Sequence, residues 1–320
     1  MCIPWHKREE VKVAKSPHAP RRSLGEHIVV ALPYLWLIAF FLVPFVIVAK
    51  ISLSQTAIAQ PPYLPVLDLS QGFAGLVAFA KELSLASYAL IASDDIYLLS
   101  YLKSLEVAGL STLMLLALGI PLAYGMARAP KRLQPVLVML VVLPFWTSFL
   151  IRIYAWVAIL QQDGLLNRVL LALGVIDAPV VWLASDTAVH IGIVYSYLPF
   201  MVLPLYASFQ KLDESFFEAA ADLGCPRWRA FFTVTLPLVM PGIGAGALLC
   251  LIPIIGEFVI PDLLGSSETM MIGQTLWTEF FANRDWPVAS AIAIVLLALL
   301  LGPIAAFERV QGPELGGRRR

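Results

Sequence analysis

The chain has 320 residues, of which 59% are hydrophobic and 14% charged, whereas a typical soluble domain has about 45–50% apolar and about 25% charged residues. Lys and Arg number 22, as do Asp and Glu, so the formal net charge is zero and nothing supports a nucleic-acid partner. Three cysteines are too few for a disulfide scaffold, and the high apolar content excludes a disordered chain. The composition therefore indicates an integral membrane protein.

Six stretches are long and apolar enough to cross a bilayer as helices, which takes about 20 residues for a hydrocarbon core of about 30 Å. In chain order they cover residues 28–49, 107–127, 133–160, 187–209, 231–256 and 286–307. Arg152 is the one Lys, Arg, Asp or Glu residue inside them. We therefore expect an all-α membrane protein with six transmembrane helices.

The basic residues gather on alternate connections between these spans. Residues 1–27 carry six Lys or Arg residues, residues 128–132 carry three, residues 210–237 carry three and residues 308–320 carry four. Because Lys and Arg are enriched in cytoplasmic loops, these segments are expected inside, together with both termini. The predicted organisation is a cytoplasmic tail before a transmembrane domain over residues 28–307, and a second cytoplasmic tail after it.

The zero net charge conceals an asymmetry across the membrane. The predicted inner segments hold 16 bases and 9 acids, whereas the outer segments and the outer interface hold 6 bases and 13 acids. An acidic outer surface raises the local concentration of cations and attracts a complementary partner. The distribution favours a cationic solute.

The predicted cytoplasmic loop at residues 210–237 has the pattern of a structured segment. Apolar residues recur on one face at helical spacing, namely Phe216, Phe217, Ala220 and Leu223. Asp213 stands ahead of this helix as an N-cap, whereas Gly224 and Pro226 end it, and a second helix begins near Trp228. By pattern alone, the first helix could equally lie on the bilayer surface.

The same loop contains Glu218-Ala219-Ala220, followed after three residues by Gly224 and after eleven more by Leu236-Pro237. This arrangement resembles the EAA-loop signature of ATP-binding-cassette (ABC) importer permeases, with Val234 where the family has isoleucine. The resemblance implies a type I ABC importer permease fold, in which this loop forms the coupling helix that docks into a cytoplasmic ATPase. The residues to which it assigns ATPase coupling, with two neighbouring aromatic anchors, are Phe216, Phe217, Glu218, Ala219, Ala220 and Gly224.

Four longer stretches, residues 143–156, 195–206, 252–265 and 273–291, resemble the polyamine branch of this family. The similarity is to the first permease subunit of bacterial putrescine and spermidine importers, which lie in the cytoplasmic (inner) membrane. It implies a heterodimer with a second permease, a cytoplasmic ATPase dimer that binds ATP and magnesium, and a periplasmic polyamine-binding protein. No cofactor is expected in this chain itself, and the preference between putrescine and spermidine is expected to lie largely in the binding protein.

Acidic and aromatic residues near the predicted outer end of the fifth span favour a path for a cation. Glu257 follows Pro253 and Gly256, which together are able to break the helix and expose carbonyl oxygens. Asp262 is expected on the same outer side. Rings that could face an ammonium group belong to Trp146, Phe258 and Trp277. The alternative for Glu257 is a wetted position at the outer interface, about 20 residues from Pro237.

Arg152 is expected near the outer end of the third span. Because an unpaired charge in hydrocarbon costs several kcal/mol, we expect a structural ion pair with Glu106 or, alternatively, Glu257. Direct contact with a polyamine is disfavoured because the two cations repel each other.

Sequence patterns for catalysis or metal binding are missing from the chain. It contains no G-x-x-x-x-G-K loop, no H-E-x-x-H and no C-x-x-C, so we expect a non-catalytic subunit without a metal site. Three alternatives remain open: a gradient-driven carrier or channel for a small cation that uses Glu257 and His190, an ABC permease for another small solute, and an assembly protein whose amphipathic loop binds the membrane.

Overall fold

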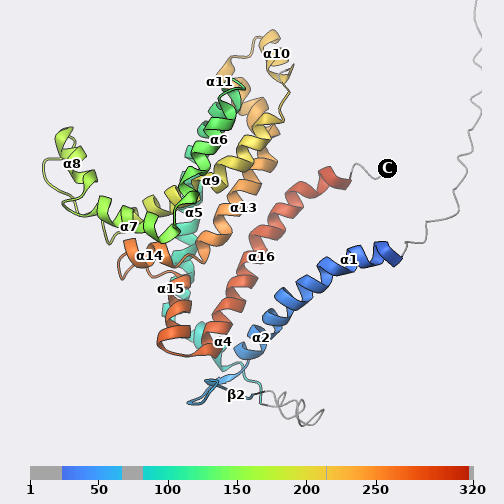
Figure 1. Cartoon of the computed structure of the whole chain (residues 1–320), viewed down its shortest axis with the longest axis vertical. Helices are drawn as coiled ribbons and strands as arrows, with labels where there is room; N and C mark the ends of the chain where they lie inside the picture. The colour runs from blue at the N-terminus through green and yellow to red at the C-terminus, as the bar shows by residue number, and fades with distance from the viewer. Residues whose placement is uncertain (1–23, 67–81, 214, 317–320) are drawn as a thin grey trace, which may run out of the picture. The chain divides into compact units, whose positions relative to one another are not determined.

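The computed structural model describes residues 24–66, 82–213 and 215–316 (Figure 1). The chain divides after Val48 into a short N-terminal unit and a main unit, residues 49–320. Most of the predicted N-terminal tail, residues 1–27, lies outside the described residues, as do residues 317–320 of the C-terminal tail.

The N-terminal unit begins the first membrane helix. Helix α1 (Leu24–Leu37) continues through the π-helical turn η1 (Ile38–Leu42) into α2 (Val43–Ser52). The wide π turn lies just ahead of Pro44, which lacks an N–H group and cannot complete the regular ladder of hydrogen bonds. A single long apolar helix, Val29–Ser52, therefore covers the first predicted span.

The main unit consists of helices with one short antiparallel ribbon, as far as the structure describes it. The strands β1 (Gln55–Thr56) and β2 (Tyr63–Leu64) pair Gln55 with Leu64. The next helices are α4 (Ala86–Ser93), α5 (Asp95–Arg128), α6 (Gln134–Val142), the 3-10 turn η3 (Leu143–Trp146), α7 (Phe149–Leu160) and α8 (Leu165–Ala172).

The second half of the main unit is also helical, as far as the structure describes it. Its elements are α9 (Asp186–Gln210), α10 (Ser215–Asp222), α11 (Arg227–Ala230), the π turn η4 (Phe231–Thr235), α12 (Leu236–Leu238), α13 (Met240–Ile255), α14 (Val259–Leu264), α15 (Ile272–Trp277), the π turn η5 (Thr278–Ala282) and α16 (Trp286–Gly316). Helices α10 and α11 lie at one end of this unit, and β1, β2 and α4 lie at the other (Figure 1).

Four helices in the described chain are long and apolar enough to cross a membrane, and two bent pairs bring the number to six. The third predicted span bends by 89° between Trp146 and Phe149, and the fifth bends by 67° between Leu238 and Met240. Prolines account for both breaks, since Pro144 lies in η3 and Pro241 follows the second bend. Each of the six predicted spans therefore corresponds to one long apolar helix or to one bent pair of helices.

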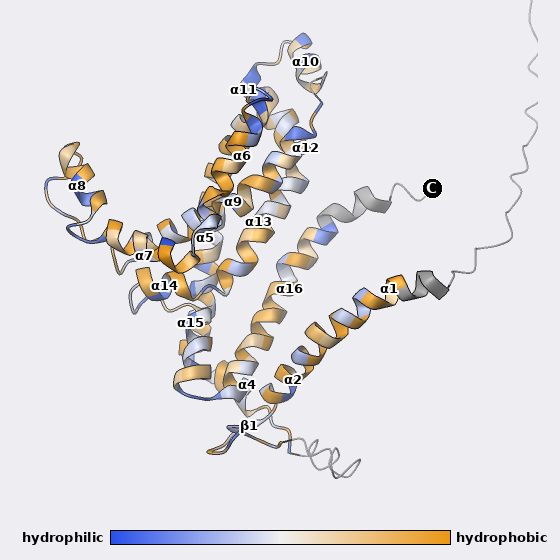
Figure 2. Cartoon of the chain, in the orientation of Figure 1, coloured by the Kyte–Doolittle hydropathy of each residue, from blue (hydrophilic) through white to orange (hydrophobic). Residues whose placement is uncertain are grey.

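Helices α5, α9 and α13 form the centre of the main unit. Leu115, Met201 and Ile254, one from each helix, are fully buried there. Small residues on α13 allow close packing: a Cβ atom on Gly242 would collide with the Ser208 hydroxyl, and one on Gly246 would lie 3.0 Å from the Met201 sulfur. Apolar residues extend along α13 and α16, whereas hydrophilic residues gather around α10 and α11 (Figure 2).

Candidate coupling loop and membrane-embedded site

The short helix α10 lies between the long helix α9 and the short helix α11, at the predicted cytoplasmic end (Figure 1). Its start is held by Asp213, whose carboxylate accepts a hydrogen bond from the Ser215 N–H at 3.0 Å. This bond favours the ionised form and lowers the pKa of Asp213. The predicted helix and its N-terminal acid are both present.

The side chains of α10 divide between solvent and the neighbouring chain. Phe216, Glu218 and Ala219 are exposed, whereas Ala220 is buried. The side chain of Phe217 lies outside the described residues. An exposed phenylalanine beside a small exposed alanine leaves a surface that another protein can approach closely.

Gly224 ends α10 with a left-handed backbone, φ +72°. Its N–H donates to the Ala221 carbonyl at 2.8 Å, and the Cys225 N–H donates to the Ala220 carbonyl at 3.0 Å. A Cβ atom at position 224 would meet nothing within 4 Å. The need for glycine here is therefore set by the backbone angle, because L-residues with side chains disfavour it.

The helix that follows enters the membrane through an irregular segment. Pro226 precedes α11, and the π turn η4 then lies just ahead of Leu236-Pro237. As at the first span, a proline without an N–H group follows a π turn. The bend at Val239 then separates this segment from α13, so the loop is joined to the core by a broken helix.

A second break lies at the other end of α13, where Gly256 ends the helix and α14 begins three residues later. The Glu257 side chain caps the new helix: its Oε1 accepts from the N–H groups of Phe258, Val259 and Ile260 at 3.1–3.4 Å. Its Oε2 accepts from the Tyr197 hydroxyl at 2.5 Å. Glu257 is buried.

This geometry changes the expected electrostatics of Glu257. The broken helix was expected to combine a carboxylate with exposed carbonyl oxygens, but the carboxyl group faces the N–H groups that begin α14. Those groups carry partial positive charge. Both carboxyl oxygens are occupied within the protein, so Glu257 is a capping residue at the break rather than a wetted surface group.

The predicted aromatic residues are only partly brought together. Phe258 stacks on Trp277, with ring centroids 4.5 Å apart, and Trp277 also contacts Phe281 at 4.1 Å. Trp146 is exposed at the end of η3, and Asp262 is exposed on α14. The structure thus gathers Glu257, Phe258 and Trp277 at one helix break.

Arg152 lies on α7, after the 89° bend. Its guanidinium carbon is 4.9 Å from the centre of the Phe145 ring and 5.7 Å from that of Phe149. Its Nε and Nη1 atoms are buried and have no hydrogen-bond partner among the described residues. The expected ion pair between Arg152 and Glu106 is therefore wrong, because the third span breaks before Arg152 and a straight helix does not give its position.

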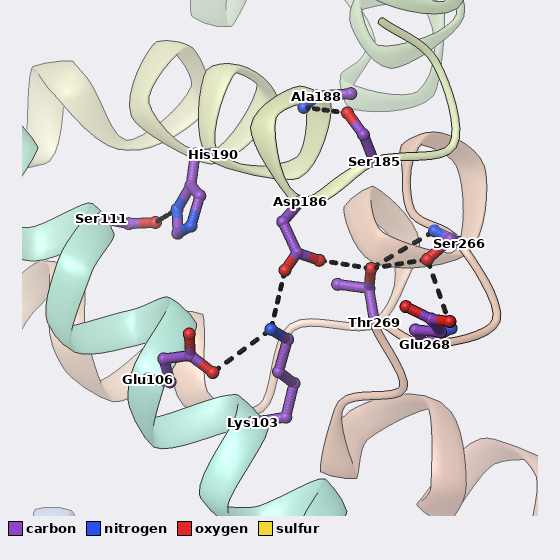
Figure 3. A network of polar contacts seen from close by, with 10 residues as sticks. All are labelled: Lys103, Glu106, Ser111, Ser185, Asp186, Ala188, His190, Ser266, Glu268 and Thr269. Atoms are coloured by element: carbon purple, nitrogen blue, oxygen red, sulfur yellow. Dashed lines mark hydrogen bonds and ion pairs between the residues drawn. The ribbon is translucent and has the colours of Figure 1, made fainter. Parts of the chain in front are cut away.

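Glu106 instead belongs to a polar network that the sequence analysis missed (Figure 3). The Lys103 ammonium lies 3.2 Å from Glu106 and 2.8 Å from Asp186, and Asp186 also accepts from the Thr269 hydroxyl at 2.6 Å. The network joins α5, the start of α9 and the segment between α14 and α15. The sequence did contain a signal for this network: Lys103 and Asp186 stand just before the second and fourth predicted spans, on the same predicted side of the membrane.

His190 also takes part in a polar contact near this network. Its Nδ1 lies 2.8 Å from the Ser111 hydroxyl (Figure 3). Among the described residues, no group of three or more His, Cys, Asp or Glu side chains is arranged to hold a metal ion.

Comparison with known proteins decides the family. The model of the family described as "Binding-protein-dependent transport system inner membrane component" matches residues 115–307, more than half of the chain. The chain belongs to this family. As an inner-membrane permease component, it is a helical membrane subunit of a transport system, in agreement with its composition and its apolar helices.

Among members of the permease family, the chain is similar to the spermidine/putrescine transport system permease protein PotB of Haemophilus influenzae. The two are 39% identical over 279 residues, which cover 86% of this chain and 91% of that protein. PotB of Escherichia coli strain K12 is 44% identical over 207 residues, 65% of this chain and 75% of that protein.

Solved structures of ABC transporters share the permease fold. A bacterial transporter of alginate, crystallised with its alginate-bound periplasmic protein, has a chain with a TM-score of 0.68 and 17% identity, covering 89% of this chain and 93% of that one. A chain of the MetNI methionine transporter in an inward-facing conformation gives a TM-score of 0.51 at 16% identity, with 66% of this chain and 92% of that chain covered. The type I importer permease fold is therefore present.

Proposed function

We propose that this chain is one of two permease subunits of an ATP-driven importer of the polyamines putrescine and spermidine. It forms the translocation path as a heterodimer with a second permease. A periplasmic binding protein delivers the polyamine, and a cytoplasmic ATPase dimer, which binds ATP and magnesium, drives the change between outward-open and inward-open states. The chain itself holds no cofactor and catalyses no reaction.

The main support for a polyamine substrate is the similarity to PotB of H. influenzae, at 39% identity over 86% of this chain. The molybdenum transport system permease protein ModB of Azotobacter vinelandii, a relative named for a different solute, is more distant at 29% identity over 61% of this chain. The predicted excess of acids outside the membrane adds support, because an acidic surface concentrates cations.

The shape of α10 supports its proposed contact with the ATPase. The helix projects at one end of the main unit (Figure 1) and exposes Phe216, Glu218 and Ala219. Gly224 permits the sharp turn into α11, which leads through a broken helix to α13 in the core. Movement of α10 by an ATPase would therefore be transmitted to the helices that form the path.

The helix break at Gly256 supports a proposed path for the polyamine. Stacked Phe258 and Trp277 offer aromatic faces for an ammonium group, and the capping bonds of Glu257 hold Phe258 in place. Asp262, exposed on α14, adds a carboxylate beyond the break. In this proposal Glu257 positions the path, whereas the aromatic rings line it.

The function is tested by reconstituting the chain in proteoliposomes with its partner permease, ATPase and binding protein. We expect uptake of radiolabelled putrescine or spermidine that requires ATP, with no uptake of molybdate. A complex whose ATPase cannot hydrolyse ATP is the matched control. Polyamine uptake without ATP would indicate a gradient-driven carrier, and ATP-driven uptake of another solute alone would overturn the polyamine substrate.

A further inference from the structure

A cavity of about 870 Å³ lies between η3 and α7 on one side and α9, α13 and α16 on the other. Aromatic and aliphatic side chains form most of its lining, including Phe145, Phe149 and Leu249. Leu249 is 49% exposed, so the cavity opens at the surface of the main unit. An open apolar cavity of this size is large enough to receive several side chains of a neighbouring molecule.

Two polar side chains in this lining lack hydrogen-bond partners in the described part of the chain. They are Arg152, through its buried Nε and Nη1 atoms, and Ser196, whose hydroxyl is also buried. The rings of Phe145 and Phe149 stabilise the guanidinium only weakly compared with a charged partner. Arg152 is half-buried, and its enclosed Nε and Nη1 atoms leave a charge at membrane depth without a counter-charge, which is costly. The described residues supply no acceptor for these atoms, so we look for one on a neighbouring molecule.

The depth of Arg152 restricts the source of that acceptor. Helix α6 has 9 residues and η3 has 4, which together extend about 20 Å from the cytoplasmic side into a core of about 30 Å. The 89° bend then turns α7 aside, so Arg152 remains within the membrane. Lipid phosphates lie at the interface, outside the hydrocarbon core, and an apolar cavity is a poor site for ordered water.

Charge complementarity selects the occupant. A polyamine is a cation and is repelled by the guanidinium. The ATPase and the binding protein lie outside the hydrocarbon core, whereas a second permease shares it. We propose that the partner permease inserts a membrane segment into this cavity and places a carboxylate against Arg152, with the Ser196 hydroxyl donating to the same group. This proposal rests on the heterodimeric importer proposed above.

The first test locates the partner directly. A photo-crosslinking amino acid is placed at Leu249 in the full complex, with Val169 on α8, which is 44% exposed and outside the cavity lining, as the matched control site. We expect light-dependent capture of the partner permease from position 249, at least tenfold above capture from position 169. Capture of lipid alone at position 249, or equal capture of the partner at both sites, overturns the proposal.

The second test addresses the charge pair. We expect Arg152→Met to release the partner permease from the purified complex at least tenfold faster than the wild type, with Arg152→Lys in between. Each membrane-embedded Asp or Glu of the partner is replaced by its amide, alone and with Arg152→Met. For the acid that pairs with Arg152, its amide variant combined with Arg152→Met should release the partner no faster than Arg152→Met alone. The proposal is overturned if Arg152→Met releases the partner at the wild-type rate. It is also overturned if the amide replacement of every partner acid speeds release by the same factor with Arg152→Met as without it.

Uptake by the wild-type complex separates this proposal from the proposed function. If the complex imports polyamine but position 249 does not capture the partner, only the cavity proposal fails. If position 249 captures the partner but the complex imports no polyamine, the substrate is wrong and the cavity proposal stands. The crosslinking arm keeps the test decisive even if Arg152→Met does not fold.

Discussion

At the scale of single residues, Glu257 shows how a side chain near a transport path can act through the backbone. Its carboxyl group accepts three backbone N–H groups at the start of α14 and the hydroxyl of Tyr197. It thereby ties the broken end of the fifth span to α9. The bonds explain why an acidic residue occurs at a break within an apolar segment, since free N–H groups there would be costly.

Replacing Glu257 separates its shape from its charge. We expect Glu257→Ala to lower the stability of the complex by about 2 kcal/mol, because the helix loses its cap and the half-buried Tyr197 hydroxyl loses its acceptor. Glu257→Gln retains an oxygen acceptor and should cost less than about 1 kcal/mol. Thermal unfolding of the purified complex measures both.

Polyamine uptake by the same two variants measures the role of the charge. If Glu257 acts by positioning, Glu257→Gln keeps uptake within twofold of the wild type and Glu257→Ala reduces it. Loss of uptake in a stable Glu257→Gln complex would instead assign the negative charge itself to the polyamine path.

At the scale of elements, the turn that ends α10 in the proposed coupling loop depends on one backbone angle. Gly224 has φ +72°, yet a Cβ atom there would have open space around it. Steric conflict with neighbours is therefore excluded as the reason for glycine. The reason is the energetic cost of the left-handed backbone angle for a residue with a side chain. This makes the position selective for residues that accept left-handed geometry.

Gly224→Asn and Gly224→Val form a matched pair at this turn. Asparagine accepts the left-handed region, whereas a β-branched side chain is strained there by about 1–2 kcal/mol. We expect Gly224→Asn to keep most ATP-driven uptake and ATPase co-purification, and Gly224→Val to lose much of both while still inserting in the membrane. Equal activity of the two variants would contradict a role for this turn in coupling.

The network of Lys103, Glu106, Asp186 and Thr269 links α5, α9 and the segment between α14 and α15 by contacts of unequal strength (Figure 3). The Lys103–Asp186 pair is the closer one, and Asp186 also accepts from Thr269. The Glu106 side chain is 63% exposed, so its pairing with Lys103 is screened by solvent.

We expect Asp186→Asn to lower the stability of the complex by about 0.5–1 kcal/mol, whereas Glu106→Gln should change it by a few tenths at most. Thermal unfolding at low and high salt measures the two effects. A large loss of stability in Glu106→Gln would contradict the weak, solvent-screened pairing of Glu106 with Lys103.

At the scale of the whole molecule, the arrangement of charge and helices defines two sides. The basic loops predict that α10 is cytoplasmic, and the ribbon of β1 and β2 lies at the opposite end of the main unit (Figure 1). Between these ends, α5, α9 and α13 pack with small residues at their contacts. The predicted sides can be tested with cysteine labels.

Cys225, which is partly exposed beside α10, serves as the inner label, whereas Cys250 is buried and should not react. We expect a membrane-impermeant maleimide to modify Cys225 only after the membrane is opened, in a chain in which Cys2 is replaced by Ser. Gln60→Cys, introduced with Cys225→Ser, should react in intact spheroplasts. The reverse pattern would invert the predicted topology.

The sequence alone was sufficient for the properties that depend on local composition. Apolar length predicted the six spans, the Lys and Arg distribution predicted their sides, and the Asp213 to Gly224 pattern predicted a capped helix with a sharp stop. These features could be read because helix length, capping and membrane insertion depend on residues within a few turns of one another.

The tertiary structure decided which polar groups meet. Pro253 and Gly256 indicated a break near the outer end of the fifth span, but only the fold gave the 89° bend after Trp146 and the 67° bend after Leu238. After those bends, Arg152 lines an open cavity. Glu106 pairs with Lys103, and Glu257 accepts hydrogen bonds from the start of α14 and from Tyr197. Such pairings join residues far apart in the chain, so their physical cause is the packing of whole helices and is absent from any local pattern.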